Sequence, residues 1–392
     1  MPIPPGDEAA GIEETTFQLS VHLADLGCDV TVIDIQGGQY QMEHRRASKL
    51  NFFEIRPFPR FGGNALNMKN HVSRSLLVKL RVFSFALLSM SPLLRLILRG
   101  KADIIHAHVG LSALSAILVN ALTGKSARVV FSSHYGGLMR PLSVRTWIFN
   151  LSELIPLWLA DHVIVDTPII KRQITSGVGI TPSKVTAVIE AIGFDDSDVE
   201  RCIAQPGSLH TSLTILTVGS LHPAKNQFTL LKAAPRVISQ FPGVKFKFVG
   251  RVGDSRYLSE MQKFVVAHGL GDSVEFLGIA KKRDLAKLYS EARIFVFTGT
   301  LESQGIVVLE AMAFGLPVVA SAIPPILDLI GPHQNCAILV DPTDAVAVSS
   351  GILSLMADQR LWNAMSSNAR ALAATYSHDR KARTVLSLYE KL

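Results

Sequence analysis

The feature that most constrains the fold is a pattern that occurs twice along the chain: short apolar runs alternate with longer stretches of helical character. This alternation is typical of parallel α/β sheets, because two parallel strands need a crossover long enough to hold a helix. The first series predicts strands at 29–35, 103–106, 127–132, 162–165 and 185–189, and helices at 13–26, 72–98, 110–122 and 168–174. The second series predicts strands at 213–218, 245–249, 274–276, 294–297, 317–320 and 337–340. We therefore expect an α/β protein with two doubly wound parallel-sheet domains, which suits a chain of 392 residues.

A polar stretch separates the two series. Residues 195–212 contain Pro206 and Gly207 and form the predicted connection between the domains. We therefore expect an N-terminal domain at 1–200 and a C-terminal domain at 208–375, followed by one more helix at 376–392.

The beginning of the chain departs from the pattern. A doubly wound domain opens with a buried strand that leads into a glycine-containing turn, but here Pro2, Pro4 and Pro5 stand where that strand would end. The turn itself is present at 6–11, and a helix begins near Ile12. We expect either that the first strand is missing from this chain or that the numbering begins downstream of the native start.

Composition argues against several classes of protein. The three cysteines, Cys28, Cys202 and Cys336, lie far apart and form no CxxC pair, which argues against a disulfide framework and fits a reducing compartment. The first residues lack the basic and apolar regions of a secretory signal. The longest apolar run, 82–94, is shorter than the roughly twenty residues that a membrane-spanning helix needs. We expect a cytoplasmic protein without a transmembrane helix, and we predict no nucleic-acid partner.

Positive charge is concentrated in one segment. Residues 44–102 contain twelve Lys or Arg residues and one acid, Glu54, although the whole chain has a net charge of only +7. Within the second half, 72–100, these cations are mixed with Leu, Val, Phe and Ile, as in a basic amphipathic helix on an anionic membrane. One interpretation is peripheral attachment to the inner face of a membrane. The alternative is a helical hairpin whose apolar side packs on a sheet and whose cations are solvated.

The stretch most informative about function is 294–321, IFVFTGTLESQGIVVLEAMAFGLPVVAS. It predicts a buried strand, a loop, a helix over about 304–314 that the chain enters at Gly305, and another strand. The backbone N–H groups at such a helix start, here those of Gly305 and Ile306, form a site for phosphate together with the positive end of the helix dipole. Glu310 lies five residues beyond Gly305, about 7.5 Å along the helix axis, which is about the reach from a diphosphate to the ribose of the same nucleotide.

A second glutamate, Glu302, lies in the loop before this helix and is separated from Glu310 by seven residues. The pair, embedded in LESQGIVVLEAMAFGLPVVAS, resembles the signature of family-4 glycosyltransferases of the GT-B fold. The resemblance implies two Rossmann-like domains that face a cleft. It also implies a retaining, metal-independent transfer of a sugar from a nucleoside-diphosphate sugar to a hydroxyl of a glycan or lipid-linked acceptor. Glu302 would contact the donor sugar, and Glu310 would bind the ribose.

Other stretches of the second series agree with the family in the same order. Residues 216–227, LTVGSLHPAKNQ, resemble the strand and turn that open the family's donor domain, and Lys225 falls on its catalytic, diphosphate-binding lysine. Ser220 stands where many members have arginine. Arg251, after the next strand, is a candidate substitute, although a solvated loop arginine is the alternative. Gly278, in the stretch FLG, matches the loop whose backbone lines the nucleobase.

Two strand ends in the first series also resemble the family. They are DIIHAH at 103–108 and FSSHYG at 131–136, and open α/β folds bind ligands at the carboxyl edge of the sheet, where such strands end. The resemblance implies that His134 contacts the donor sugar and that the last helix, with Tyr389, crosses back onto the first domain. The residues assigned to the acceptor side are Gly11, His106 and His108.

Metal and dinucleotide motifs are weak or missing. The triplet Asp196–Ser197–Asp198 matches the DxD motif that holds a metal in other glycosyltransferases, but it lies in the predicted connection, where solvated acids are the better explanation. No HExxH pattern or cysteine–histidine cluster occurs, and no GxGxxG follows a strand. We therefore predict no bound metal and no cofactor besides the nucleotide-sugar substrate.

The predicted reaction requires stabilisation of charge on the departing diphosphate. Lys225 and the helix start at Gly305 supply positive potential that can replace a metal. The resemblance points to attack on the same face of the sugar, with the leaving phosphate oxygen taking the acceptor's proton, rather than to a covalent nucleophile. Two alternatives remain open: a sugar-nucleotide epimerase of the same fold, and a catalytically silent nucleotide-sugar binder or partner subunit. Ser220, the missing first strand, and Pro324 and Pro325 in place of glycines motivate the silent binder.

Overall fold

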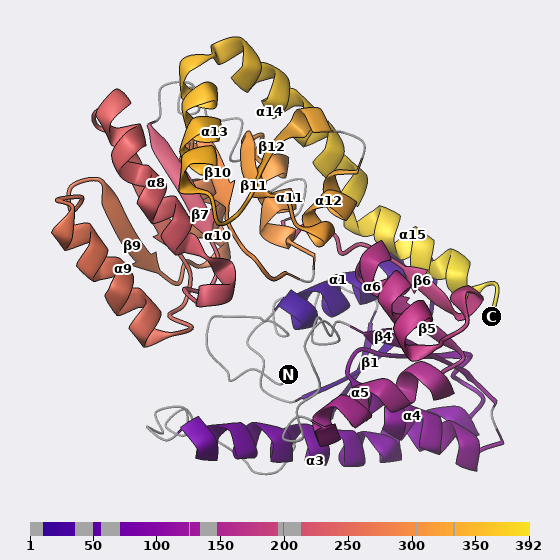
Figure 1. Cartoon of the computed structure of the whole chain (residues 1–392). Helices are drawn as coiled ribbons and strands as arrows, with labels where there is room; N and C mark the ends of the chain where they lie inside the picture. The colour runs from indigo at the N-terminus through magenta and orange to yellow at the C-terminus, as the bar shows by residue number, and fades with distance from the viewer. Residues whose placement is uncertain are drawn as a thin grey trace. The chain divides into compact units, whose positions relative to one another are not determined.

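The computed structural model describes residues 11–35, 50–55, 71–124, 126–133, 147–194, 199, 213–302, 304–331 and 334–392. The chain forms two compact units. Unit 1 comprises Met1–Ile189 together with His378–Leu392, and unit 2 comprises Glu190–Ser377. Figure 1 shows that each unit combines parallel strands with covering helices, so each is an α/β domain.

Unit 1 contains a four-stranded parallel sheet in the order β3-β4-β5-β6. Its strands are β3 (Ile104–Ala107), β4 (Arg128–Ser133), β5 (His162–Val165) and β6 (Val185–Ala187). Two further strands, β1 (Thr31–Ile35) and β2 (Asn51–Ile55), pair with each other in a separate parallel sheet. Among the described residues, no strand hydrogen-bonds to both β1 and β3. The predicted absence of a strand before the first helix concerns residues 1–10, which lie outside the described part of the chain.

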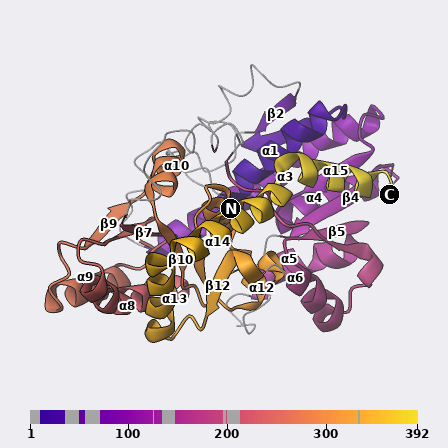
Figure 2. The same ribbon diagram turned by 90° about the horizontal axis from the view of Figure 1, so that it is seen from above.

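The helices of unit 1 cover both faces of the larger sheet (Figures 1 and 2). Alternate residues of β4 show this arrangement: Phe131 packs in the cluster that contains Leu93 and Leu157, whereas Val130 packs with Leu19 and Val385. A strand buried on both faces is apolar throughout, which explains the continuous run Val129–Phe131. The helices are α1 (Gly11–Asp25), α3 (His71–Leu98), α4 (Gly110–Leu122), α5 (Trp147–Leu159), α6 (Pro168–Gln173) and α15 (His378–Tyr389).

Unit 2 is built on a six-stranded parallel sheet in the order β12-β11-β10-β7-β8-β9. The strands are β7 (Thr214–Val218), β8 (Lys245–Val249), β9 (Val274–Gly278), β10 (Ile294–Phe297), β11 (Val318–Ser321) and β12 (Ala337–Val340). The chain runs from β7 outward to β9 and then returns to place β10 on the other side of β7. The strand order therefore reverses between β7 and β10, and open α/β sheets bind ligands at such a switch point.

In the described part of unit 2, the helices around this sheet are α8 (Gln227–Gln240), α9 (Ser255–Ala267), α10 (Lys282–Glu291), α11 (Ile306–Ala313), α12 (Pro324–Ile330), α13 (Ala345–Ala357) and α14 (Gln359–Ala373). Central residues of β8 and β10, such as Phe246 and Val296, are fully buried. They share one core with Leu231 of α8 and Ile352 of α13, so the sheet has a rigid centre from which its loops project.

The predicted strands and helices agree with the structure to within about three residues at each end. No bounds were predicted for β2, for α5 or for the helices of unit 2 other than α11. The short strand β2 and the helix α5 were not predicted, because β2 lies within the basic segment and α5 is apolar nearly all round. Helix α11 begins at Ile306 rather than near 304, because Gly305 has a φ of 90°, outside the helical region.

Candidate active site

The sequence-predicted donor residues gather at the carboxyl edge of the sheet of unit 2. Ser220 follows β7, Arg251 follows β8, Gly278 ends β9 and Glu302 follows β10. Backbone hydrogen bonds join the first three loops: Leu221 N donates to the Arg251 carbonyl at 2.8 Å, and Gly250 N donates to the Gly278 carbonyl at 2.7 Å. The structure therefore brings together residues that are separated by up to 82 positions in the sequence, at the edge where this fold binds ligands.

Lys225 and Glu302 form an ion pair at the switch point. Lys225 ends a 3₁₀ turn, Pro223–Lys225, on the loop after β7, and its Nζ contacts Oε2 of Glu302 on the loop after β10. The two side chains retain 26% and 13% of their exposure, so the pair is partly shielded yet accessible. A partly buried cation at this position can exchange its carboxylate partner for a phosphate.

The two loops that carry this pair are themselves held together. Thr300 N donates to the Ala224 carbonyl at 3.0 Å, and the Thr298 hydroxyl donates to the Asn226 carbonyl at 2.9 Å. Asn226 adopts a φ of 47°, the only positive φ at a non-glycine residue in the described part of the chain. This left-handed turn ends the 3₁₀ segment and starts α8, so it fixes the position of Lys225.

The start of α11 favours glycine, and its N-cap residue offers no side-chain acceptor to the first amides. Gly305 has a φ of 90°, and a Cβ there would lie 2.5 Å from Cδ1 of Ile326. As the N-cap residue, Gly305 has no side chain that could accept from the N–H groups of the first turn. The first N–H groups of a helix have no partner within the helix and lie at the positive end of its dipole, and here that end follows the loop that holds Glu302.

Glu310 lies on the second turn of α11 and is already held by two donors. The Tyr289 hydroxyl of α10 donates to its Oε2 at 2.9 Å, and the backbone N–H of Gly193 donates to the same carboxylate. Burial raises the pKa of Glu310 above its usual value, while the hydrogen bond from Tyr289 and the charge of Lys282 oppose that rise. Burial, together with the neighbouring Glu310 charge, also places the pKa of Tyr289 well above its usual value.

The segment 190–194, which we call the connecting segment, packs against this part of unit 2. Phe194 meets the rings of Tyr289 and Phe314 edge to face, at centroid distances of 5.9 and 5.1 Å. Lys282 Nζ lies 5.7 Å from the centroid of the Phe194 ring. A Cβ on Gly193 would lie 2.5 Å from Oε1 of Glu310, so only glycine allows this close approach.

Gln304 ties the same segment to the Glu302 loop. Its side chain is buried, with 2% exposure, and pairs with the backbone of Glu190 through two hydrogen bonds. Glu190 N donates to Oε1 at 3.1 Å, and Nε2 donates to the Glu190 carbonyl at 3.1 Å. The sequence analysis did not identify Tyr289, Gly193 or Gln304, because none belongs to a motif with a recognised chemical role.

Ser220 stands where the resemblance predicts an arginine, and Arg251 is the predicted substitute on the neighbouring loop. Arg251 is exposed on the loop after β8, and Ser220 is partly buried on the neighbouring loop. A Cβ on Gly253 would lie 3.6 Å from Cβ of Ser220, so the two loops pack closely. Arg251 therefore stays an expected substitute, one strand further from Glu302 than Lys225 is.

Unit 1 places one predicted histidine in a hydrogen-bonded chain. Nδ1 of His106 lies 2.6 Å from the Tyr389 hydroxyl, and its Nε2 lies 2.7 Å from Oγ of Ser132. His108 stacks on His106 with a centroid distance of 4.2 Å. Burial raises the pKa of Tyr389 far above its usual value, so this hydroxyl stays protonated. His134 lies outside the described residues, and Gly11 is the first residue of α1.

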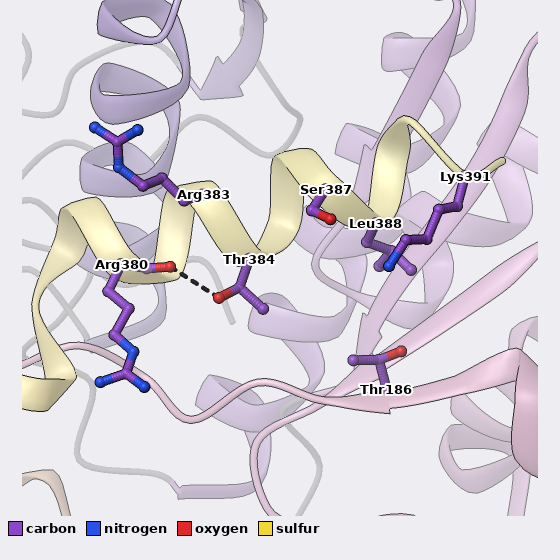
Figure 3. A pocket seen from close by; sticks show the side chains of 7 residues that line it. All are labelled: Thr186, Arg380, Arg383, Thr384, Ser387, Leu388 and Lys391. Carbon is purple, nitrogen blue, oxygen red and sulfur yellow. Dashed lines mark hydrogen bonds between the residues drawn. The ribbon is translucent and has the colours of Figure 1, made fainter.

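A separate open groove of about 420 Å³ lies between β6 and α15 in unit 1. Figure 3 shows Arg380 of α15, and Lys391 just after this helix, on the side that faces Thr186, whereas Arg383 extends from the other side of α15. Arg383 Nε donates to Asp379 at 2.8 Å. No sequence-predicted site residue lines this groove, whose walls are Thr186, Arg380, Arg383, Thr384, Ser387, Leu388 and Lys391.

Two family models match the chain and together cover most of it. Residues 9–189 match the model described as Glycosyltransferase Family 4, and residues 198–372 match the model described as Glycosyl transferases group 1. With the donor-site motif placed at the switch point of a parallel sheet, these matches define the class. The chain belongs to the family-4 glycosyltransferases.

Known relatives are distant and in part longer. A D-inositol 3-phosphate glycosyltransferase of Geodermatophilus obscurus is 27% identical over 239 residues, which are 59% of this chain and 52% of that protein. An uncharacterised glycosyltransferase of Methanocaldococcus jannaschii is 25% identical over 300 residues, which are 74% of this chain and 75% of that protein. The chain thus spans about half the length of the first of these relatives and three quarters of the second.

Solved structures show the same fold at low identity. HepE of Anabaena, in complex with UDP and glucose, matches with a TM-score of 0.73 at 18% identity, covering 99% of this chain and 98% of that one. Sucrose-phosphate synthase of Thermosynechococcus elongatus matches with a TM-score of 0.70 at 21% identity, covering 98% and 94%. The fold is therefore GT-B.

Two features bear on metals and membranes. Within the described ranges, no three His, Cys, Asp or Glu side chains lie close enough together to hold a metal ion. No helix in the described part of the chain is both long enough and apolar enough to cross a membrane.

Proposed function

We propose that this chain transfers a sugar from a nucleoside-diphosphate sugar to a hydroxyl group of an acceptor, with retention of the anomeric configuration. The observation that carries the proposal is the Lys225–Glu302 ion pair on the loops next to α11, a helix that starts at a glycine N-cap, at the switch point of unit 2. When the donor binds, its diphosphate pairs with Lys225 and accepts hydrogen bonds from the backbone amides at Ile306. Glu302, released from the lysine, then accepts hydroxyl groups of the donor sugar.

Glu310 retains the capacity to bind the ribose. A carboxylate offers about four acceptor positions, and Tyr289 and Gly193 occupy two of them. The remaining positions accept the two ribose hydroxyls, while the two protein donors fix the direction in which the carboxylate points. The nucleotide is therefore held at two points of α11, by its phosphates at the N-terminus and by its ribose at Glu310, one turn further on.

The departing diphosphate is stabilised by charges that are already in place. Lys225 and the dipole of α11 concentrate positive potential where negative charge grows, and we propose that no metal is needed for this purpose. We assign no covalent nucleophile, because Glu302 is paired with Lys225 and Glu310 is held by Tyr289 and Gly193. In the proposed same-face reaction, the bond from the sugar to the phosphate oxygen breaks. The acceptor oxygen then bonds to the anomeric carbon, and its proton passes to the leaving phosphate oxygen.

Acceptor binding is assigned to unit 1. His106 lies between Tyr389 and Ser132, and His108 stacks beside it, so this chain of groups can bind and orient hydroxyls. We propose that His134 contacts the donor sugar and that the acceptor is a glycan or a lipid-linked sugar. We also propose a cytoplasmic location with peripheral attachment to the inner membrane face.

The direct test is donor binding followed by turnover. Thermal-shift measurements with UDP-, GDP- and ADP-sugars identify the donor, because a ligand that binds only the folded state raises its stability. Turnover is measured as nucleoside diphosphate release that depends on an acceptor, with and without a chelator, and the anomer of the product is assigned by NMR. We expect the chelator to have no effect and the anomer to be retained.

Lys225→Ala tests the catalytic assignment. Loss of one preorganised charge at a developing anion lowers kcat by about 10²–10³-fold. Lys263→Ala, an exposed lysine of α9, is the matched control and should behave like the wild type. Equal turnover of the Lys225 variant and the control would refute the proposed mechanism.

The same measurements separate the alternatives. Nucleotide binding without acceptor-dependent release would favour a silent binder, which Ser220 in place of the family's arginine motivates. Appearance of an isomeric nucleotide sugar in the absence of acceptor would favour an epimerase.

A further inference from the structure

Exposed hydrophobic side chains in unit 1 are confined to one group of helices. In the described residues of unit 1, every large hydrophobic side chain that is exposed lies on α3, α4 or α5. These three helices are neighbours, since α3 packs on α4 and α4 packs on α5 (Figure 1). We call this surface the α3–α5 face. Its members are Phe83, Leu87, Leu88, Leu94, Leu98, Leu118, Leu122, Ile155, Trp158 and Leu159.

Helix α3 has two apolar stripes rather than one. Its core stripe is buried and runs through Ala86, Ser89, Leu93 and Ile97, with spacings of three, four and four residues. Its second stripe is exposed. This stripe consists of Phe83, Leu87, Leu94 and Leu98, which are 58%, 58%, 38% and 70% exposed. Spacings of four, seven and four residues place these side chains on one line along the helix. A surface helix of a globular domain needs only the core stripe, so the second stripe faces another apolar medium.

The other two helices extend the stripe into a surface. Leu118 and Leu122, one turn apart on α4, are 50% and 73% exposed. On α5, Trp158 and Leu159 are 54% and 58% exposed. The Lys184 ammonium donates to the Trp158 carbonyl, so an indole and a cation lie at the same edge of the face. Tryptophan beside a cation is typical of the boundary between lipid and water.

The charges around the face are positive. Arg95, Arg99 and Lys101 are exposed at the end of α3 and directly after it. Among the described side chains, none of the three helices carries an exposed acid. The one acid on them, Glu153, is buried and accepts a hydrogen bond from Gly110 N at 3.0 Å.

Among the described side chains on these helices and directly after them, exposed carboxylates occur only beyond the helix ends. Asp103 follows α3, and Asp161 follows α5 and pairs with Arg128. Apolar surface rimmed by cations complements an anionic bilayer. A second copy of the chain would instead bring like charges together across a symmetric interface.

We propose that the α3–α5 face lies on the surface of an anionic lipid bilayer, with its exposed apolar side chains among the acyl chains and its cations at the headgroups. Because no described helix can cross a membrane, the face rests in the interface and does not span it. The inference deepens the proposed function, because it places the enzyme where a lipid-linked acceptor is found. The surface itself does not depend on catalysis.

The test is flotation of the full chain with vesicles of phosphatidylcholine alone and of equal parts phosphatidylcholine and phosphatidylglycerol. We expect binding to the anionic vesicles at low salt, weaker binding to the neutral ones, and loss of binding as salt screens the cations. The charge variant Arg95→Gln/Arg99→Gln should bind the anionic vesicles about 25-fold more weakly, at roughly fivefold for each cation.

The apolar variant Leu87→Gln/Leu94→Gln/Leu98→Gln should bind at least about tenfold more weakly. Its matched control, Val266→Gln/Ile279→Gln/Val346→Gln, removes three exposed apolar side chains from unit 2 and should bind like the wild type. All substituted positions are exposed, so the variants keep the fold, which circular dichroism verifies. Binding of a nucleotide sugar in the thermal-shift assay should not change.

Three results would overturn the proposal. The first is no binding of the wild type to anionic vesicles at low salt, and the second is equal binding of the apolar variant and the wild type. The third is a wild-type dimer that the apolar variant converts to a monomer in light scattering, which would assign the face to a second copy. Failure of the proposed function is distinguishable, because it appears as missing donor binding or turnover in a chain that still floats with vesicles.

Discussion

Replacing Tyr289 by phenylalanine tests how Glu310 is held in place. The Tyr289 ring is fully buried, and its hydroxyl donates to Oε2 of Glu310 at 2.9 Å. The substitution keeps the ring and removes one hydrogen bond to a carboxylate, an interaction that contributes about 1.5–3 kcal/mol. The free energy of unfolding of unit 2 should fall by about that amount near neutral pH, which corresponds to several degrees in Tm for a domain of this size.

The loss should depend on pH. Burial raises the pKa of Glu310, and the hydrogen bond from Tyr289 opposes the rise because it stabilises the charged form. Without the hydroxyl, the pKa of Glu310 rises further. An acid whose folded pKa exceeds its unfolded value of about 4.3 binds protons on folding, so stability falls as the pH rises between the two values. The effect of Tyr289→Phe should therefore be largest above the folded pKa of Glu310, and below the unfolded one it should shrink to the loss of a neutral hydrogen bond, about 0.5–1.5 kcal/mol.

The assay is denaturant unfolding of both proteins at about pH 7.5 and at about pH 4, just below the unfolded pKa of glutamate, followed by circular dichroism. Tyr257→Phe is the matched control, because the Tyr257 hydroxyl accepts from the backbone N–H of Phe228 at 2.8 Å and no carboxylate is involved. Burial raises the pKa of Tyr257 to about 12, so this group does not titrate in the range. The control should lose about 0.5–1.5 kcal/mol at both pH values. A loss for Tyr289→Phe that is independent of pH, or no larger than that of the control, would refute the reasoning.

Two further substitutions test the loop before α11. Gly305→Ala should destabilise unit 2 by about 2–4 kcal/mol and abolish nucleotide binding, because it combines a positive φ with a Cβ 2.5 Å from Ile326. Gly269 also has a positive φ, but no atom lies within 4 Å of the position of an added Cβ, so Gly269→Ala should cost only about 1–2 kcal/mol. Equal losses for the two variants in denaturant unfolding would show that the contact with Ile326 does not contribute. Gln304→Ala should cost about 2–4 kcal/mol by leaving the buried N–H and carbonyl of Glu190 without its amide, and should weaken nucleotide binding by calorimetry. Gln359→Ala, which removes partly exposed contacts to Arg293 and Asn363, should cost less than half as much, and a larger loss than that of Gln304→Ala would contradict the assignment.

The parts of the fold that the sequence predicted are those whose signal is local. The strands Lys245–Val249, Ile294–Phe297 and Ala337–Val340 have the predicted boundaries, because apolar runs between turn residues specify a buried parallel strand. Helix α5 has no such signal, since a segment that is apolar nearly all round shows no helical period. The order of strands around β7 is also absent from local sequence, since it depends on crossovers between distant segments.

The candidate site also contains residues with a local sequence signal and residues without one. Lys225, Gly305 and Glu302 were predicted as site residues because a motif marks them, and the fold brings them to one edge. Tyr289 lies on an amphipathic helix where an aromatic residue is ordinary core material, so only its distance to Glu310 reveals its part. Gln304 lies between two motif residues and was not assigned, because its partner is a backbone 114 positions away.

The pairing of Gln304 with Glu190 links the Glu302 loop to the point where the chain enters unit 2. The chain enters unit 2 at Glu190 and leaves it at Ser377, and Ile192 N donates to the Tyr376 carbonyl at 3.2 Å. Both ends of the unit are thus fastened to each other, and the first is fastened to the loop that bears Glu302. We therefore expect that a sugar nucleotide that moves the Glu302 loop on binding also moves the two chain segments that connect unit 2 to unit 1. Because such coupling is reciprocal, a displacement of these two segments should change the affinity for the nucleotide by the same factor by which nucleotide binding favours that displacement.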